Sequence, residues 1–365
     1  MTIPYGIVGG GRGSFIADVH IRAIAACGRA EMAAGCFSRS PEKSADAAAH
    51  YGVSPERTYA TYTEMAQAEG ARADGIRFVV IASPNNTHYA CAKAFLENGI
   101  AVSCDKPVAL FAEEAAELQA LAREKNLPFC VTYTFAGPPA LRHIRTLIAD
   151  GALGTIRMVA GENVQDWLVA DAGDIAPWRM NPDIAGKSNC LADIGSHVEF
   201  AARFTTGLEP ERVCCMLDRY DYPLDANASI LVQYKGGARG IYWATQVAYG
   251  NDNGMRLRIY GDNGSVEWAN ESPETFRLTL AGQPTMQIVK GKHYDNPMFS
   301  RKSRLPSGHA EGWYYAFADI YAGFLAALDG DTAAYYPSID DGAAGMRFID
   351  ACYESDQSGN CWVTV

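Results

Sequence analysis

This 365-residue sequence lacks the features that mark several classes of protein. Its ten cysteines include no C-x-x-C pair, so we expect reduced thiols rather than a cysteine-bound zinc ion. It has no apolar run of about 18 residues, the length that a membrane span needs. The N-terminal residues show neither a signal peptide nor a twin arginine. These absences predict a cytoplasmic protein that does not bind a membrane.

The sequence also has fewer basic than acidic residues. Lys and Arg total 31 against 42 Asp and Glu, which gives a formal net charge of −11. Nucleic acids and anionic lipid surfaces both require a basic face, so we expect neither as a partner. A chain of this length exceeds what one hydrophobic core usually serves, which favours two domains.

The pattern of apolar residues changes along the chain. In the first third, strand patterns such as "IRFVVIAS" alternate with helical patterns such as "EEAAELQALAREKN", which predicts a parallel sheet covered on both faces. From about residue 151, strand patterns follow one another across short turns such as "KGG" and "GDNG". This second pattern predicts an open, mostly antiparallel sheet. The boundary is expected near "GPPALRHIRTLIADG".

A glycine-rich segment, "GIVGGGRGS", follows the first predicted strand and opens the first predicted helix. It has the form G-x-G-x-x-S, with Gly9, Gly11 and Ser14 in the three fingerprint positions. Glycines there permit a tight turn and let a pyrophosphate approach the helix N-terminus. We therefore predict an α/β fold, with a Rossmann dinucleotide-binding domain over residues 1–136 and an α+β domain over residues 137–365.

The end of the second predicted strand bears on the choice of cofactor. NAD-preferring sites usually place Asp or Glu there, to bind the ribose hydroxyls. This chain has Ser38 and Arg39 instead. A hydroxyl and a guanidinium suit a 2′-phosphate, which slightly favours NADP. Arg39 can equally stack on an adenine or face water, so these residues leave NAD and NADP both open.

Three segments together resemble the Gfo/Idh/MocA family of NAD(P)-dependent oxidoreductases: "GIVGGGRGSFIADVH", "VVIASPNNTHYACAKAFLENGIAVSCDKPVAL" and "AGKSNCLADIGSHVEF". The resemblance covers nearly the whole chain. Its most specific block contains Ser83-Pro84-Asn85, His88 and Asp105-Lys106-Pro107, with Asp105 where the family usually has Glu. The late segment "RLPSGHAEGWYYAFADIYAGF" is similar to that of relatives such as levoglucosan, glycoside and inositol dehydrogenases.

This resemblance implies an enzyme that transfers hydride between NAD(P) and a secondary hydroxyl of a sugar, glycoside or cyclitol. It implies Lys106, Asp193 and His197 as catalytic residues. A histidine titrates near neutral pH, so His197 is the expected general base. Asp193 would orient it or bind a neighbouring hydroxyl, and Lys106 would stabilise alkoxide character on the reacting oxygen.

Other interpretations of these residues are open. Asp193 can be the N-cap of the helix that follows it, and His197 can be a buried core histidine. Their i, i+4 spacing also suits a metal ion, but no third ligand with useful spacing is apparent, so we expect no metal.

The remaining site residues follow from the same motifs, the strand ends and the loop "APWRMNPDIAGKSN". Residues expected to bind the cofactor are Gly9, Gly11, Arg12, Ser14, Phe15, Ser38, Arg39, Ser83, Pro84, Asn85, His88, Asp105 and Lys106. Residues expected to bind the substrate are Lys106, Tyr133, Trp178, Arg179, Asp193, His197 and His309.

Two other functions are compatible with parts of this pattern. One is a glycosidase or lyase that oxidises, eliminates and reduces again on bound NAD, with no net redox change. The other is a nucleotide-sensing regulator without activity, which would have no need of Lys106, Asp193 and His197. The expected partners are a small carbohydrate or cyclitol and, as the family implies, further copies of the chain, in a homodimer or homotetramer formed through the C-terminal sheet.

Overall fold

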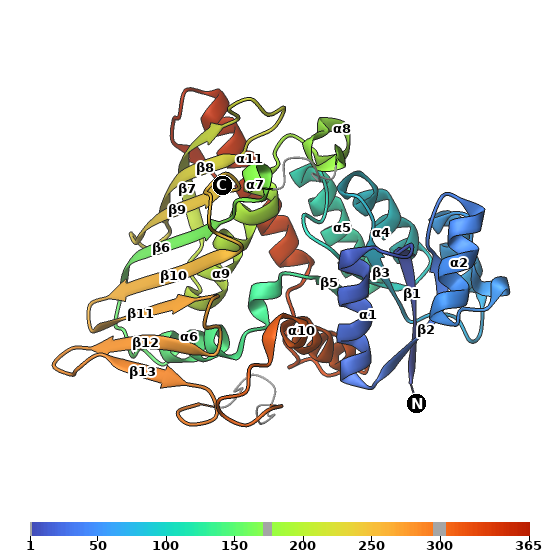
Figure 1. The fold of residues 1–365 in the computed structure, drawn as a ribbon, viewed down its shortest axis with the longest axis horizontal. Coiled ribbons are helices and arrows are strands. Elements are labelled where there is room, and N and C mark those ends of the chain that lie inside the picture. Colours follow the sequence, from blue (N-terminus) through green and yellow to red (C-terminus); the bar gives the residue numbers. More distant parts are fainter. Residues whose placement is uncertain (1, 171–176, 295–303) are drawn as a thin grey trace. The chain divides into compact units, whose positions relative to one another are not determined.

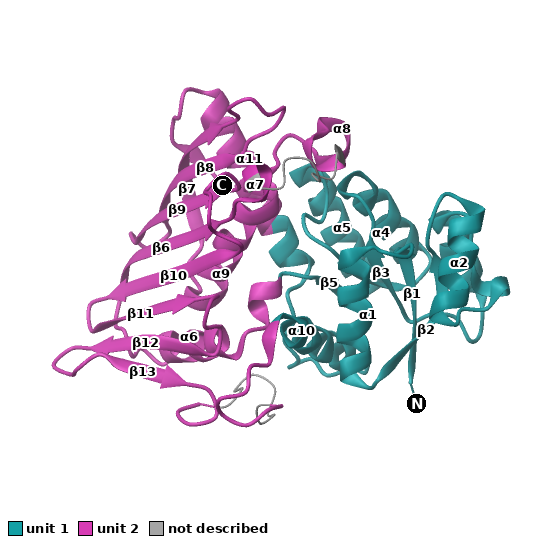
Figure 2. Cartoon of the chain, viewed as in Figure 1, with its two compact units in different colours: residues 1–133, 313–343 teal, residues 134–312, 344–365 magenta. Residues whose placement is uncertain are grey.

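The computed structural model describes residues 2–170, 177–294 and 304–365 and is drawn in Figure 1. Its contacts divide the chain into two compact units, coloured in Figure 2. The first unit comprises Met1–Tyr133 and Trp313–Ala343. The second comprises Thr134–Gly312 and Ala344–Val365.

The first unit is built on a parallel sheet with the strand order β2-β1-β3-β4-β5. Its strands are β1 (Ile3–Gly9), β2 (Ala30–Cys36), β3 (Phe78–Ala82), β4 (Ala101–Cys104) and β5 (Phe129–Val131). Its helices before β5 are α1 (Phe15–Cys27), α2 (Pro41–Tyr51), α3 (Tyr62–Ala71), α4 (His88–Glu97) and α5 (Ala112–Lys125). Every residue of β3 and β4 is buried, as expected for strands covered on both faces.

Helix α10 (Gly312–Leu328) completes the core of this unit although it comes late in the sequence. The ten residues from Ala316 to Leu325 are all buried, so the helix needs a core on every side. Phe324 packs edge-on against Phe78 of β3, with ring centroids 5.3 Å apart. The sequence division placed all of 137–365 in one domain, whereas these contacts group Trp313–Ala343 with the first unit.

The second unit contains a nine-stranded sheet with the order β13-β12-β11-β10-β6-β9-β8-β7-β14. Among its pairs only β6 and β9 run parallel within the described residues. The strands are β6 (Ile156–Val164), β7 (Pro210–Asp218), β8 (Asn227–Tyr234), β9 (Arg239–Thr245), β10 (Gly254–Gly261), β11 (Gly264–Ala269), β12 (Thr275–Leu280), β13 (Met286–Val289) and β14 (Val363–Thr364). The predicted fold class, a Rossmann domain followed by an α+β domain with a mostly antiparallel sheet, is confirmed.

Helices lie on one face of this second sheet, as Figure 1 shows for α6 and α9. The helices of the unit are α6 (Pro139–Ala149), α7 (Trp167–Ala170), α8 (Pro182–Ala185), α9 (Ser196–Thr206) and the end of α11 (Ile339–Gln357). Side chains on the strands alternate between buried and exposed, as in β9, so the opposite face of the sheet is open. No helix in the described part of the chain is both long and apolar enough to cross a membrane.

Candidate active site

The predicted cofactor residues of the first unit lie where its strands end. Gly9 is the last residue of β1, Ser83 follows β3 and Asp105 follows β4. Neighbouring strands pair in register up to these points, with Gly9 opposite Ala82 and Ile81 opposite Cys104. Because the strands are parallel, these segments share the carboxyl edge of the sheet, where open α/β sheets bind ligands.

The two fingerprint glycines serve different purposes. Gly9 has φ +89°, and a Cβ there would lie 2.6 Å from the Ala82 carbonyl oxygen, so the fold itself requires glycine. At Gly11, whose φ is not positive, a Cβ would meet only the Phe37 carbonyl oxygen at an ordinary 3.5 Å. Nothing in the described chain therefore demands glycine at Gly11, and its bare backbone fits close approach of a ligand such as a pyrophosphate.

The start of helix α1 also suits an anion. Ser14 is its N-cap residue and makes no side-chain capping hydrogen bond. The first N–H groups of a helix have no partners within the helix and carry partial positive charge. Next to them Phe15 is 70% exposed and stacks on Trp313 at 5.6 Å, while exposed Arg12 pairs with Asp46 at 3.3 Å. Both predicted neighbours of the glycine loop thus lie at the surface.

Ser38 and Arg39 follow β2 at the expected ribose position. The Ser38 hydroxyl oxygen accepts a hydrogen bond from the Ser40 backbone N–H at 3.1 Å, which leaves its own proton for another acceptor. Arg39 is exposed. Neither residue is a carboxylate, so this strand end offers donors to a ribose hydroxyl or phosphate.

The loop after β3 holds Ser83, Pro84 and Asn85, which enter a short 3₁₀ turn (Asn85–Thr87). His88 begins α4 and is only 1% exposed. Its Nδ1 lies 2.7 Å from the Pro107 carbonyl oxygen and its Nε2 lies 2.8 Å from the Ser83 carbonyl oxygen. The structure thus places His88 between two loops rather than on an open surface.

Lys106 stands in the loop after β4 and is half-buried. Asp105 holds this loop, because its Oδ1 accepts from the Lys106 backbone N–H at 3.0 Å and from the Thr132 hydroxyl at 2.9 Å. Tyr133, a predicted substrate residue beyond β5, is 1% exposed. Burial raises the pKa of the nearby Cys104 thiol well above its usual value, so this thiol is not a nucleophile at neutral pH.

In the second unit, Asp193 lies in a single π-helical turn (Leu191–Gly195) that runs directly into α9. It is therefore not the N-cap of α9, which was one sequence interpretation. Such turns are rare and occur often at functional sites. The half-buried His197 follows in the first turn of α9, with its ring edge-on to Phe135 at a centroid distance of 5.2 Å.

The Asp193 carboxylate contacts side chains from other segments, among them Arg179 and Gln246. Its Oδ2 lies 3.1 Å from Nη1 of Arg179 and accepts from the Gln246 side-chain amide at 3.0 Å. The Arg179 guanidinium in turn lies over two indole rings, those of Trp178 at 4.9 Å and Trp167 at 5.8 Å. The structure thus brings three predicted residues together and fixes the direction of the carboxylate.

Further polar residues hold Gln246 and the π-helical turn of Asp193 in place. The Asn189 side-chain amide donates to the Gln246 side-chain oxygen at 2.6 Å. The buried Asp225 carboxylate accepts the backbone N–H groups of Asn189 and Leu191, each at 2.8 Å. Burial raises the pKa of Asp225, and these two N–H donors partly offset the shift. Asp225 thereby anchors the chain that enters the π-helical turn.

His309 lies in a different setting, within the segment that precedes α10. Its side chain is exposed, and its backbone oxygen accepts from the Lys290 ammonium at 3.4 Å. The Lys290 side chain is 1% exposed and pairs with Glu274 at 2.8 Å and Glu311 at 3.0 Å. A buried ion cluster therefore fixes the backbone at His309 while its imidazole stays in contact with solvent.

Sequence reasoning missed Gln246 and Trp167 as neighbours of the predicted site. Gln246 follows β9 and is fully buried, and Trp167 begins α7. Both are distant in sequence from Asp193, so no local spacing connects them. The described residues contain no group of three His, Cys, Asp or Glu side chains arranged to hold a metal ion.

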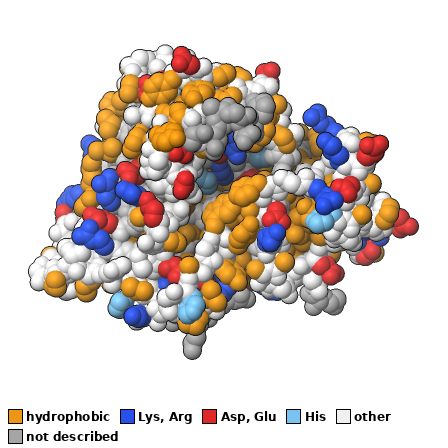
Figure 3. All heavy atoms as spheres, in the orientation of Figure 1, with side chains coloured by type: hydrophobic (Ala, Val, Ile, Leu, Met, Phe, Trp, Pro, Cys, Tyr) orange, Lys and Arg blue, Asp and Glu red, His pale blue; other side chains and the backbone are white. Residues whose placement is uncertain are grey.

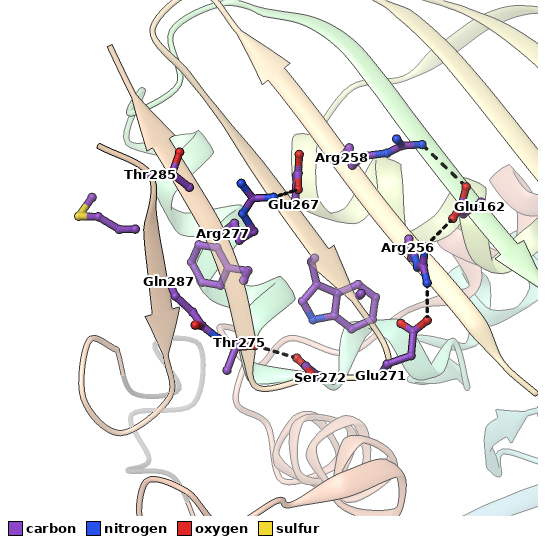
Figure 4. A pocket seen from close by; sticks show the side chains of 14 residues that line it. Glu162, Arg256, Arg258, Glu267, Glu271, Ser272, Thr275, Arg277, Thr285 and Gln287 are labelled. Carbon is purple, nitrogen blue, oxygen red and sulfur yellow. Dashed lines mark hydrogen bonds and ion pairs between the residues drawn. The ribbon is translucent and has the colours of Figure 1, made fainter. Parts of the chain in front are cut away.

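A separate hollow of about 920 Å³ lies on the sheet of the second unit and contains none of the predicted site residues. Figure 3 shows basic and acidic side chains side by side over this sheet, and Figure 4 shows the hollow at close range. Its arginines pair with its own glutamates, as in Arg277–Glu267 at 2.9 Å and Arg256–Glu271 at 2.9 Å. These charges neutralise one another, so the hollow offers no net charge to a ligand.

A parallel sheet with a glycine-bearing carboxyl edge, followed by a mostly antiparallel sheet, defines the class of two-unit dinucleotide-binding proteins. Residues 3–133 match the model of an oxidoreductase family with an NAD-binding Rossmann fold, and residues 141–267 match the GFO/IDH/MocA C-terminal domain. The chain belongs to the Gfo/Idh/MocA family of NAD-binding oxidoreductases.

Three relatives place it within that family. The chain is 34% identical to an uncharacterized oxidoreductase of Bacillus subtilis, YfiI, over 99% of this chain and 96% of that one. It is 28% identical to levoglucosan dehydrogenase of Pseudarthrobacter phenanthrenivorans over 80% of each chain. The crystal structure of an inositol dehydrogenase homolog from Azotobacter vinelandii, complexed with NADH and myo-inositol, has a TM-score of 0.93 at 32% identity and covers 100% of this chain and 98% of that one.

Proposed function

We propose that this protein oxidises a secondary hydroxyl of a sugar, glycoside or cyclitol with NAD, or runs the reverse reduction. The observation that carries the proposal is the Asp193 carboxylate, fixed by Arg179 and Gln246 one helical turn before His197. The substrates in the names of two relatives, levoglucosan and inositol, support the substrate class.

This proposal gives a separate role to each of three residues, Lys106, Asp193 and His197. Bound NAD supplies the hydride acceptor. The Lys106 ammonium donates to the reacting oxygen and stabilises its negative charge as the proton leaves. His197 accepts the hydroxyl proton, since an imidazole titrates near working pH without a large shift. Asp193, held in place by Arg179, accepts a hydrogen bond from a neighbouring hydroxyl and fixes the ring in one orientation.

NAD rather than NADP is the proposed cofactor, because the family model is NAD-binding and a relative binds NADH. The Ser38 and Arg39 side chains then serve the ribose hydroxyls and the adenine. The test is kcat/KM for one polyol with each cofactor. A higher value with NADP would overturn this assignment and leave the remaining proposal intact.

The experiment that tests the function is a dehydrogenase screen over anhydrosugars, glycosides and inositols with purified protein. For the best substrate, Lys106→Met and His197→Gln should each lower kcat at least about 100-fold, the usual effect of losing an electrostatic or acid–base group. Lys93→Met and His50→Gln are controls at residues outside the predicted site, half-buried and exposed respectively, and should leave kcat unchanged. Unchanged turnover in both site variants would contradict the site, and aglycone release without NADH accumulation would instead identify a redox-neutral glycosidase or lyase.

The proposal also includes the oligomeric state of the protein and its cellular compartment. All ten cysteines are free thiols in the structure, which supports a reducing compartment such as the cytoplasm. The open face of the second sheet exposes large apolar side chains, which supports a homodimer or homotetramer formed through it.

A further inference from the structure

We infer that His88 is a positioning residue that ties the nucleotide-binding loop after β3 to the loop that carries Lys106. The functional roles of these two loops rest on the proposed function. The link that His88 makes between them rests on the geometry of the first unit. It departs from the expectation that His88 lines the cofactor pocket, since the side chain is 1% exposed.

Both ring nitrogens of His88 are engaged by backbone. Nδ1 lies 2.7 Å from the carbonyl oxygen of Pro107, the residue directly after Lys106. Nε2 lies 2.8 Å from the carbonyl oxygen of Ser83, the first residue after β3. One rigid ring therefore spans two adjacent strand ends and touches each loop at its first or third residue.

These contacts need the ring as a hydrogen-bond donor. A carbonyl oxygen only accepts, and a neutral imidazole carries a single N–H, so the ring donates to one of the two carbonyl oxygens in each tautomer. Leaving a buried carbonyl unsatisfied is costly, which makes the ring hard to replace by an apolar group of similar size. Since each nitrogen serves one loop, the two effects of His88 should be separable.

Two substitutions separate the effect of His88 on the Ser83 loop from its effect on the Pro107 loop. The side-chain amide of Asn reaches the position of Nδ1, and that of Gln reaches the position of Nε2. His88→Asn keeps a donor for Pro107 and loses the tie to Ser83. His88→Gln keeps a donor for Ser83 and loses the tie to Pro107.

The readouts are the Kd for NADH, by fluorescence titration, and kcat at saturating NAD and polyol. His88→Asn should weaken NADH binding about tenfold with kcat near the wild-type value, on the scale of one lost buried hydrogen bond. His88→Gln should lower kcat about tenfold with the Kd for NADH near the wild-type value. The labelling rate of Lys106 with acetic anhydride, followed by mass spectrometry, should change in His88→Gln alone.

His20→Asn is the matched control, because His20 is also a fully buried histidine of this unit but bonds to Tyr321 rather than to a loop. It should lower the unfolding temperature without moving the Kd, kcat or labelling rate. Equal changes of Kd and kcat in both His88 variants, or a change in unfolding temperature alone, would overturn the inference. If the wild-type protein oxidises no polyol, the proposed function fails, whereas the NADH and labelling measurements still decide the role of His88.

Discussion

At the scale of single residues, Arg179 determines what Asp193 can do. Its guanidinium is held over two indoles and pairs with the carboxylate at 3.1 Å, with side-chain exposures of 35% and 22% for the pair. Arg179→Met keeps an apolar stem against the rings but removes the charge. We expect kcat/KM for the polyol to fall about tenfold, since charge-assisted hydrogen bonds contribute about 1.5–3 kcal/mol and partial exposure reduces this.

Arg179→Lys is the matched variant for this measurement. Lysine keeps the charge but cannot present a planar fork to the carboxylate or stack between rings, so an intermediate loss is expected. Steady-state kinetics on both variants, with the Kd for NADH as a reference, check the prediction. An Arg179→Met enzyme with wild-type kcat/KM would show that Asp193 is positioned without Arg179.

At the scale of elements, the first unit follows from sequence better than the second. The sequence itself marks both ends of helix α2, with Pro41 at its first position and a glycine directly after Tyr51. In strand β12 the sequence carries a signal, because Phe276 and Leu278 alternate with exposed or half-buried neighbours. The four-residue β13 is too short for periodicity to reveal.

The candidate site was predictable only in part, for a physical reason. Family motifs mark Lys106, Asp193 and His197, because their chemistry depends on residue type and local spacing. Gln246 reaches Asp193 across 53 positions of sequence, so only the fold brings the two together. The sequence also did not show which unit α10 belongs to, since an apolar helix fits the core of either unit.

A buried link between elements of the first unit makes its stability depend on pH. His20 of α1 bonds through Nδ1 to the Tyr321 hydroxyl of α10 at 2.7 Å, and Ser103 of β4 donates to the same oxygen at 3.1 Å. Burial lowers the pKa of His20 below its ordinary value of 6.5, partly offset by the charge of Asp105. As the pH falls below 6.5, the unfolded chain therefore binds the proton first.

The stabilisation that depends on neutral His20 is present above pH 6.5 and is lost as the pH falls towards the folded-state pKa. The loss can reach about 1.4 kcal/mol per pH unit. His20→Asn keeps a hydrogen-bonding side chain next to the Tyr321 hydroxyl and removes the titration. Unfolding temperatures at pH 7.5 and 5.5 should differ less for the variant than for the wild type, and an equal difference would contradict this account.

At the scale of the whole molecule, the open face of the second sheet has an apolar half and a charged half. One row of paired residues crosses it from β7 to β12: Cys214, Leu231, Ile241, Ala160, Arg258, Glu267 and Arg277. In the apolar half Leu231 is 46% and Ile241 is 47% exposed, and the next row adds Met216 and Trp243 at 47% and 40%. Large apolar side chains gathered on one sheet face mark a contact surface for another protein.

We expect a second copy of the chain on this surface, related by a two-fold axis so that the same patch meets itself. Ile241→Asp then places a carboxylate in the contact twice, once from each copy, and neither charge gains a partner. Burying unpaired charge costs several kcal/mol, so the dissociation constant should rise at least about 100-fold. Sedimentation equilibrium at micromolar concentrations measures the change.

Phe111→Asp introduces the same charge at a side chain of the first unit that is also 47% exposed, and it should leave the mass unchanged. A wild-type monomer, or an Ile241→Asp protein that keeps the wild-type mass, would rule out this face as the contact.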